Sequence, residues 1–355
     1  MRATRVMHVR HSIQLLLVLW TAAGASAVLA QTAGSEPGRA AAQAPALPVD
    51  KDMGAWLKRM QEAPRRRAYA GTYVVSSSAG ALSSARIWHV CDGSQQMERI
   101  EALTGAPRST FRRNDEVLTF RADEKTVVAE KREAPGLFPN RQIVGDKVIA
   151  EFYTLQAAGS ERVAGHDADV VQLVPRDALR YGYRVWSEKK TGLVVKLQTI
   201  DGSGRVLEQS AFSELQLDAP VKMDQLARMM AGTSGYRVEK AEVVTTTAGA
   251  EGWSIRNAVP GFLPTTCLKR QISPGQVGPG MLQWVFSDGL ASVSLFVEGF
   301  DPQRHRREGM SALGATQSLT KHLSNRSEGD WWLTVVGEVP AQTLQAFAQG
   351  LERRK

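Results

Sequence analysis

The sequence is poor in the residues and motifs on which most enzyme sites depend. It has 355 residues but only two cysteines and six histidines. None of them has a recognised zinc spacing, and the chain contains no nucleophile elbow, P-loop or dinucleotide-binding glycine pattern. The tract His166-Asp167-Ala168-Asp169 comes nearest to a ligand cluster, but such residues are typical of a turn before a strand. The sequence therefore predicts no catalytic residues, no metal and no cofactor.

The two cysteines, Cys91 and Cys267, are too few to define a disulfide framework. An oxidising compartment would permit one bridge between them, provided that their Cα atoms lie within about 7 Å. Because they fall in different predicted domains, we expect two unpaired, half-buried thiols, and a bridge stays the alternative. His89 shares the strand face of Cys91. An activated thiol there is the alternative to an incidental pair.

The apolar run near the N-terminus is too short to hold the chain in a membrane. It spans residues 13–20 and an Ala-rich stretch, whereas a bilayer requires ~20 apolar residues. Three arginines precede the run, and small residues suited to cleavage follow at 25–30. This order is typical of an export signal. We therefore expect residues 1–30 to be removed, residues 31–49 to be a disordered leader, and the mature protein to lie in the periplasm. A retained anchor is the alternative.

Charge of one sign is only in mild excess. The net charge of +8 falls to about +5 without residues 1–30, which hold three arginines and no acidic residue. Two basic clusters stand out, at Arg65-Arg66-Arg67 and at 304–307. A solvated basic rim explains both, and an anion-facing patch for lipid headgroups or an acidic partner is the sharper alternative. An exported chain without a recognised nucleic-acid motif is not expected to bind nucleic acid.

Period-two alternation of apolar residues begins at Tyr69 and predicts an α+β fold dominated by one large antiparallel sheet. Short turns with Gly, Asp or Asn separate the expected strands. So few helices among about ten strands favour a single strongly curved sheet over residues 50–219. The expected strands are 69–76, 85–91, 96–103, 108–113, 117–121, 126–130, 169–174, 183–187, 193–200 and 205–217, with helices at 50–60 and 147–156.

Residues 220–250 interrupt this pattern and predict a linker. The segment 221–230 can form a helix, and the polar, small residues after it are typical of an interdomain connection. A second, smaller α+β domain is expected over residues 251–352. Its expected strands are 253–257, 265–270, 282–287, 291–298, 314–322 and 330–339, and its closing helix is 340–351.

The aromatic residues, 7% of the chain, are the best candidates for a binding surface. Several strands of the large domain are apolar on both faces. This suggests that one face packs on a helix while the other lines an apolar concavity, and a sandwich core is the alternative. Aromatic side chains facing such a concavity would form a pocket for an acyl chain or an apolar peptide segment. The candidates are Trp88, Phe111, Phe120, Tyr183, Trp186 and Phe212.

Trp331 and Trp332 are neighbours on a predicted strand, so their side chains point to opposite faces. One of them should belong to the core, and the other should project outward unless a linker or partner covers it. An exposed Trp commonly anchors an interface. We take both as candidate partner-binding residues of the small domain, together with Arg304, Arg306 and Arg307.

Short tracts spread over both predicted domains resemble the RseB/MucB family of periplasmic regulators. Any one tract is weak, but their shared order behind an export signal is specific. The tracts include RYGYRVW from Arg180, GRVLEQ from Gly204, VPGF from Val259, SDGLASVS from Ser287 and VVGEVP from Val335.

The resemblance implies a large domain similar to the unclosed β-barrel of LolA-type lipoprotein carriers, followed by a smaller domain. It implies a negative regulator of the envelope-stress sigma factor sigma-E. Such a protein binds the periplasmic domain of an RseA- or MucA-like anti-sigma factor, shields it from proteolysis, and is released by lipopolysaccharide or another lipid. A homo-oligomer stays open. The alternatives are a periplasmic lipid or lipoprotein carrier and, against the missing motifs, an envelope hydrolase.

Overall fold

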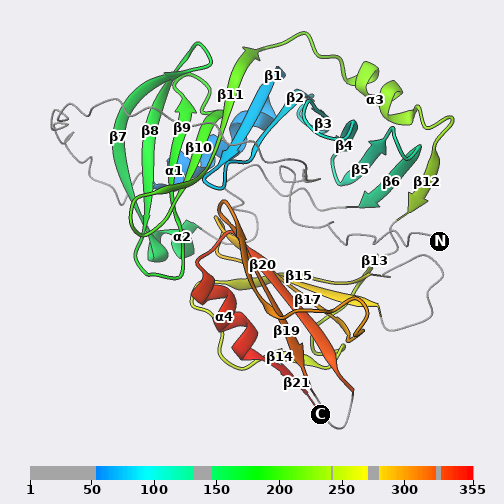
Figure 1. Ribbon diagram of the computed structural model, residues 1–355. Coiled ribbons are helices and arrows are strands. Elements are labelled where there is room, and N and C mark those ends of the chain that lie inside the picture. The colour runs from blue at the N-terminus through cyan, green and yellow to red at the C-terminus, as the bar shows by residue number, and fades with distance from the viewer. Residues whose placement is uncertain (1–52, 132–145, 241–242, 271–279, 325–328, 355) are drawn as a thin grey trace, which may run out of the picture.

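The chain folds into two β-sheet domains, one above the other in Figure 1. The computed structural model describes residues 53–131, 146–240, 243–270, 280–324 and 329–354. The expected export signal, the expected leader and the first three residues of the expected helix 50–60 lie outside the described residues. The expected fold class is confirmed: a large open sheet and a separate smaller sheet, each with covering helices.

The large sheet has 12 strands and does not close on itself. In order across the sheet they are β12 (Arg237–Lys240), β6 (Thr126–Lys131), β5 (Glu116–Arg121), β4 (Arg108–Arg113), β3 (Gln96–Ala102), β2 (Leu82–Cys91), β1 (Tyr69–Ser77), β11 (Val206–Leu217), β10 (Val194–Ile200), β9 (Gly182–Glu188), β8 (His166–Pro175) and β7 (Tyr153–Val163). The two end strands, β12 and β7, do not pair with each other, and Figure 1 shows the sheet curving between them. The edge pair β12–β6 is parallel, so the expectation of a wholly antiparallel order is wrong there.

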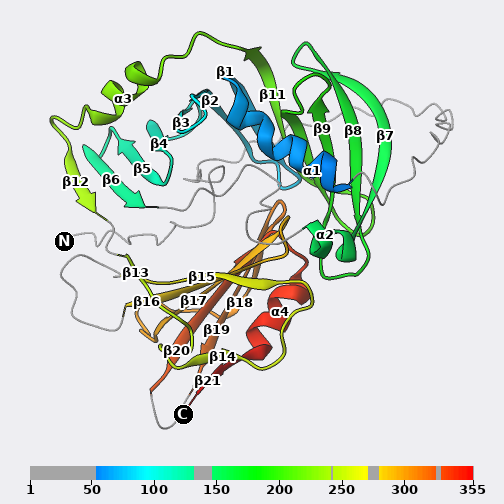
Figure 2. The ribbon, with the colours of Figure 1, turned by 180° about the vertical axis from the view of Figure 1, so that it is seen from behind.

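Helix α1 (Met53–Glu62) covers the β8–β10 part of this sheet (Figure 2). Its side chains Met53, Leu57 and Met60 recur at three- and four-residue spacing and are all buried. They pack in one cluster with Tyr183 and Val185 of β9. The expected helix at 50–60 is thus present, and the short 3-10 helix η1 (Ala63–Arg66) continues it.

The expected helix at 147–156 is only half right. Helix α2 (Asp146–Phe152) ends at Phe152, and β7 begins at the next residue. In β7, Leu155 pairs with Leu173 of β8, so its backbone belongs to the sheet ladder. The sequence hides this boundary because Phe152 and Leu155 also fit a helical period.

The predicted linker contains regular structure. Helix α3 (Met223–Ala231) packs Leu226 and Met230 against the large sheet, beside Phe111 and Phe120. The chain then adds β12 to the edge of that sheet before β13 (Val243–Thr245) joins the small sheet. Most of the expected linker therefore belongs to one domain or the other.

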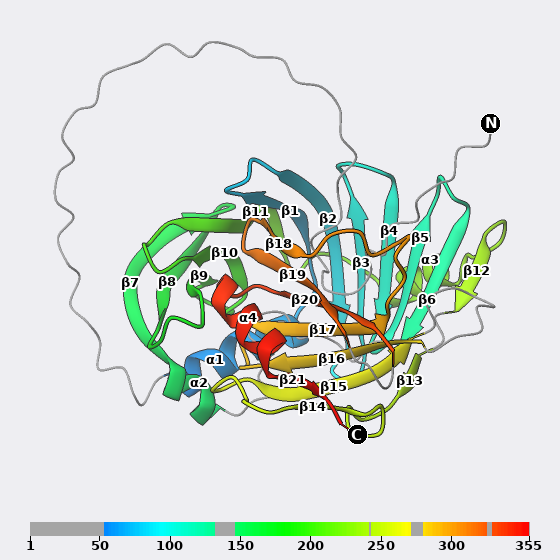
Figure 3. The same cartoon turned by 60° about the horizontal axis from the view of Figure 1, so that its bottom comes forward.

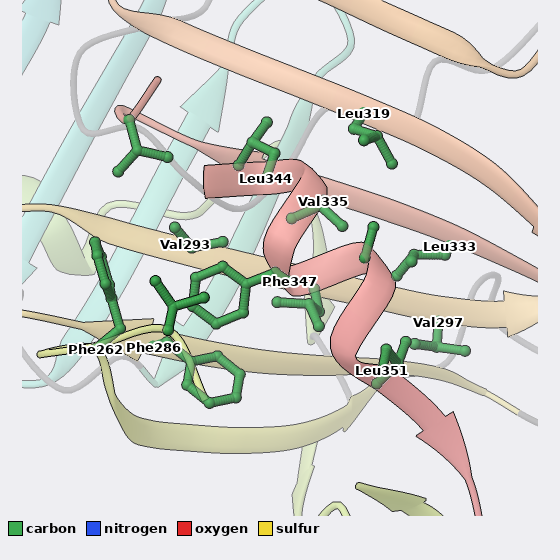
Figure 4. Packing of buried hydrophobic residues seen from close by; sticks show 14 of the residues in the cluster. Phe262, Phe286, Val293, Val297, Leu319, Leu333, Val335, Leu344, Phe347 and Leu351 are labelled. Atoms are coloured by element: carbon green, nitrogen blue, oxygen red, sulfur yellow. The ribbon is translucent and has the colours of Figure 1, made fainter. Parts of the chain in front are cut away.

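The small domain is a seven-stranded antiparallel sheet with one helix, α4 (Ala341–Gly350). Figure 4 shows Leu344 and Phe347 of α4 packed over Phe286, Val293 and Val335 of the sheet. In order the strands are β13, β15 (Leu263–Arg270), β16 (Met281–Ser287), β17 (Ser292–Gly299), β20 (Trp331–Gly337), β19 (Thr316–Leu323) and β18 (Gly309–Leu313). A separate pair joins β14 (Trp253–Ile255) to β21 (Leu351–Arg353).

Most expected strands are confirmed to within a few residues, and β4 has the expected bounds Arg108–Arg113. Five strands were missed because they are short, exposed or masked by a neighbouring pattern. These are β7, β12, β13, β18 and β21.

Candidate functional site

The six aromatic candidates of the large domain do not meet in one pocket. Five of them are distributed over three clusters: Trp186 and Phe212 in one, Tyr183 under α1 and α2 in another, and Phe111 and Phe120 under α3 in the third. These five are buried, with exposed fractions between 1% and 8%. Packing on neighbouring side chains accounts for their positions, and a role in ligand binding stays a prediction.

Trp88 is the candidate that keeps an open surface. It is half-buried on β2 and carries two guanidinium groups near its ring. The Arg99 carbon Cζ lies 4.8 Å and that of Arg86 5.5 Å from the ring centroid. Arg99 also lies 5.6 Å from the ring of Phe111. Trp88 therefore forms part of a cationic, aromatic surface on the β2–β4 region.

Trp331 and Trp332, the candidate tryptophans of the small domain, both have packing roles. Trp332 is 6% exposed and stacks on His305, with ring centroids 4.8 Å apart and an angle of 5° between the rings. Trp331 is half-buried against Trp253, and the Arg353 guanidinium lies over both rings. Neither side chain projects freely, so their partner-binding role stays a prediction.

The three arginines of the basic cluster 304–307 differ in their surroundings. Arg304 bonds to Glu298 at 3.0 Å and to Asp301 at 2.9 Å, which holds it inside its own loop. Arg306 is exposed and donates to the carbonyl oxygen of Gln303 at 3.2 Å. Arg307 is exposed as well. All three arginines are exposed, and their partner-binding role stays a prediction.

A buried contact between the domains was missed by the sequence analysis. Arg180, from the β8–β9 connection, donates from Nε to Oδ2 of Asp288 in the small domain at 2.8 Å, and neither side chain is exposed. Tyr153 Oη donates to the same oxygen at 3.0 Å. The guanidinium also bonds to the Pro260 carbonyl and lies 4.1 Å from the Phe152 ring centroid. These partners satisfy a charge that would be costly to bury alone.

The sequence tracts that contain these two residues are recognisable, but they do not indicate that the residues meet. Arg180 and Asp288 both stand in tracts that carry the family likeness, RYGYRVW and SDGLASVS. They are 108 residues apart, and nothing in their spacing predicts that they meet.

The rest of the domain contact combines hydrogen bonds, an ion pair between Arg270 and Glu130 at 3.7 Å, and a small apolar cluster of Tyr181, Leu207 and Ala315. Thr343 Oγ1 of α4 donates to the Leu179 carbonyl at 2.7 Å. Gln317 Nε2 of β19 donates to Tyr181 Oη at 3.3 Å. Gly314, in the β18–β19 turn, lies so close to β1 that an added Cβ would come within 2.8 Å of Ser77 Cβ. Figure 3 shows this end of the small sheet beside β1 and β11.

Two carboxyl groups near this contact form no ion pair with a basic side chain of the described residues. Burial raises the pKa of Glu208, on β11, to about 8, and the nearby Glu338 adds to the shift. Burial also raises the pKa of Glu338, which follows β20. Among the described residues, Glu208 Oε2 and Ser77 Oγ are buried without a hydrogen-bond partner. The contact between the two domains therefore favours the protonated, neutral form of Glu208 and Glu338.

The cysteines behave as expected, free and half-buried. Burial raises the pKa of Cys91, and it raises the pKa of Cys267 to about 11, so neither is an activated thiolate. His89 Nε2 contacts the Pro64 carbonyl at 2.7 Å. Within the described ranges, no group of three or more His, Cys, Asp or Glu side chains is arranged to hold a metal ion. In that same part of the chain, no helix is both long and apolar enough to cross a membrane.

The open sheet, the docked small domain and the buried contact between them define a two-domain β-sheet protein. Comparison with known proteins then shows that the chain belongs to the MucB/RseB family. The MucB/RseB N-terminal domain matches residues 52–230, and the MucB/RseB C-terminal domain matches residues 247–352.

Curated relatives and solved structures agree with this assignment. The chain is 32% identical over 303 residues to the sigma factor AlgU regulatory protein MucB of Pseudomonas aeruginosa, covering 84% of this chain and 90% of the relative. It is 24% identical to the sigma-E factor regulatory protein RseB of Salmonella typhimurium, covering 86% and 92%. The structure matches the MucA/MucB complex of P. aeruginosa with a TM-score of 0.66 at 30% identity, covering 86% of this chain and 99% of that one.

Proposed function

We propose that this protein is a negative regulator of an envelope-stress sigma factor of the sigma-E type. It binds the periplasmic domain of a MucA- or RseA-like anti-sigma factor and shields that domain from proteolysis. The observation that carries the proposal is the match over both domains to MucB, a sigma factor regulator that has been solved in complex with MucA.

The proposal assigns the chain to binding rather than to catalysis. The family consists of regulatory proteins, and the sequence carries no known catalytic motif. A location in the periplasm is supported by the signal-like residues 1–30. It is also supported by the solved complex of MucB with MucA(peri).

The mechanism rests on linkage between two ligands. An acyl-bearing lipid such as lipopolysaccharide, bound to the large domain, and an anti-sigma segment that requires a particular arrangement of the two domains weaken each other by the same factor. The buried contact between Arg180 and Asp288 fixes how the small domain docks. Both ligands would act on this contact, because each favours a different arrangement of the two domains.

A pull-down with the periplasmic domain of the MucA-like protein from the same genome tests the proposal. The full chain without residues 1–30 should retain the partner, and saturating lipopolysaccharide should weaken retention. The Arg306→Ala/Arg307→Ala variant removes two exposed arginines of the candidate surface and should retain the partner less well. If the full chain instead carries co-purified lipid and never retains the partner, the protein is a lipid carrier and the proposal is wrong.

A further inference from the structure

The structure brings two basic segments, far apart in the sequence, to the walls of one cleft. The cleft has a volume of about 370 Å³ and opens between α1–η1 and the β9–β10 turn. This volume lies within the range of small-molecule sites. The residues around it are Ala55, Lys58, Arg59, Glu62, Ala63, Arg66, Arg67, Lys190 and Thr191.

Positive charge in the cleft far exceeds negative charge. Five of the residues around it are Lys or Arg, and one, Glu62, is acidic. Glu62 is shared between Arg66 at 2.6 Å and Lys58 at 3.8 Å, and both basic side chains remain about 70% exposed. Arg67 pairs with Asp218 outside the cleft at 2.8 Å. This surplus of positive charge raises the local concentration of anions at the cleft.

The wall that carries Lys190 is held firmly against α1. Glu188 accepts hydrogen bonds from the backbone amides of Lys190 at 3.1 Å and Thr191 at 2.7 Å, which fixes the turn. Arg59 of α1 donates to the Lys189 carbonyl, and its side chain lies over Gly192. Gly192 has a φ of +81°, and a Cβ there would come within 2.7 Å of Arg59 Cγ. The cleft is therefore a fixed feature of the fold and does not depend on loose surface side chains alone.

A favourable interaction with the dipole of α1 does not explain the positions of all five basic residues of the cleft. Arg59 lies in the last turn of α1, where a cation is favourable. Arg67 follows η1, and Lys190 comes from a turn more than a hundred residues away, so neither belongs to that helix end. A basic concavity with Arg forks and Lys point charges matches the chemistry of a phosphate group.

We propose that this cleft binds a phosphate-bearing group, either the headgroup of an anionic lipid or a soluble phosphate ester. Arg66 and Lys190 face the group from opposite walls, and Lys58 adds a third charge. The site is separate from the seam of the two domains and does not depend on the anti-sigma partner.

The sequence supplies a matched control one residue away on each wall. Arg65 and Lys189 neighbour Arg66 and Lys190, but neither contributes to the cleft. The test therefore compares Arg66→Ala/Lys190→Ala with Arg65→Ala/Lys189→Ala, two variants of equal charge. Both should unfold at the same temperature as the parent, because the side chains removed are largely exposed.

Two probes distinguish the sources of phosphate. Pyrophosphate is titrated calorimetrically into the full chain without residues 1–30, and the same protein is sedimented with phosphatidylcholine vesicles with and without phosphatidic acid. The cleft variant should bind the probe roughly tenfold more weakly, and the control should change less than about twofold. Binding of pyrophosphate alone identifies a soluble ester, whereas binding to phosphatidic acid that pyrophosphate displaces identifies a headgroup.

Three results would overturn the proposal. The parent protein could bind neither probe, or the two double variants could lose binding equally, which would reflect overall charge. The third result is that the cleft variant weakens only capture of the anti-sigma domain, which would make the cleft a protein-docking surface. The last measurement also separates this proposal from the proposed function, since partner capture can persist while phosphate binding is lost.

Discussion

Arg180 and Asp288 form a fully buried ion pair that crosses from the large domain to the small one, with 2.8 Å between Nε and Oδ2. Burial raises the pKa of Asp288, while the amides of Leu290 and Ala291 and the Arg180 charge oppose that shift. The carboxyl group therefore depends on these partners to offset the cost of its burial. Such a pair makes docking specific more than it makes the protein stable.

Replacing Arg180 with Met should therefore be severe. The substitution leaves Asp288 buried without its cation, and the expected loss of unfolding free energy is about 3–5 kcal/mol. Equilibrium unfolding in urea measures this loss. Arg205→Met is the control, because Arg205 is 72% exposed in its pair with Asp201 and should cost at most about 1 kcal/mol. Equal losses in the two variants would show that the buried pair has no special role.

Gly314 offers a second test of domain docking. It has a φ of +61° and contacts β1, so Gly314→Ala adds both backbone strain and a clash with Ser77. Gly204 also has a positive φ, +83°, but has open space around it. Both alanine variants should lose about 1–2 kcal/mol through strain. Only Gly314→Ala should also loosen the domain contact, seen as faster proteolysis of the β18–β19 turn. Unchanged proteolysis in Gly314→Ala would contradict the contact.

The sequence allowed the strand layout to be predicted but not the contacts that join the domains. Glycine turns and period-two alternation located most strands because those signals are local. The edge strand β12 was not predicted, since its parallel pairing with β6 joins Arg237 to Thr126, and strands β7 to β11 lie between these two residues in the sequence. Leu155 was assigned to a helix because its apolar spacing fits both periods, and only the partner strand β8 decides between them.

The candidate site shows the same limit. The aromatic candidates were correctly predicted as apolar residues of strands. Whether each side chain lies in the core or in a pocket depends on which helix covers that face of the sheet. Phe120 became core because α3, from the expected linker, packs on it. Only one wall of the basic cleft could be expected from the sequence, because Arg65-Arg66-Arg67 forms a recognisable basic cluster whereas Lys190 was not singled out.

The stability of the docked arrangement should depend on pH through Glu208. Its pKa in the folded protein is raised from 4.5 to about 8, so the docked state binds a proton more tightly than the separated state. The stabilisation is therefore complete below pH 4.5 and is lost as the pH rises through about 8. Glu338 and Tyr73 face the same carboxyl group and should sharpen or shift the transition.

Thermal unfolding across this pH range provides the measurement. Glu208→Gln is neutral at every pH and should flatten the decline on the alkaline side. Glu214→Gln, an exposed position on the same strand, is the control and should keep the parent's profile. A Glu208→Gln variant with an unchanged profile would assign the pH dependence to other groups.

Substitution of Trp88 and of Trp186 by Ala distinguishes a binding role from a packing role among the aromatic candidates. Trp186 is 2% exposed, and Trp186→Ala should cost about 3–5 kcal/mol of stability because it empties a core position. Trp88 is half-buried beneath Arg99 and Arg86. Trp88→Ala should cost distinctly less, since an exposed cation–π contact contributes about 0.5–1 kcal/mol. Urea unfolding gives both values, and a lipopolysaccharide-binding assay on the folded Trp88→Ala variant then isolates the surface. Full lipid binding by that variant would remove Trp88 from the ligand site.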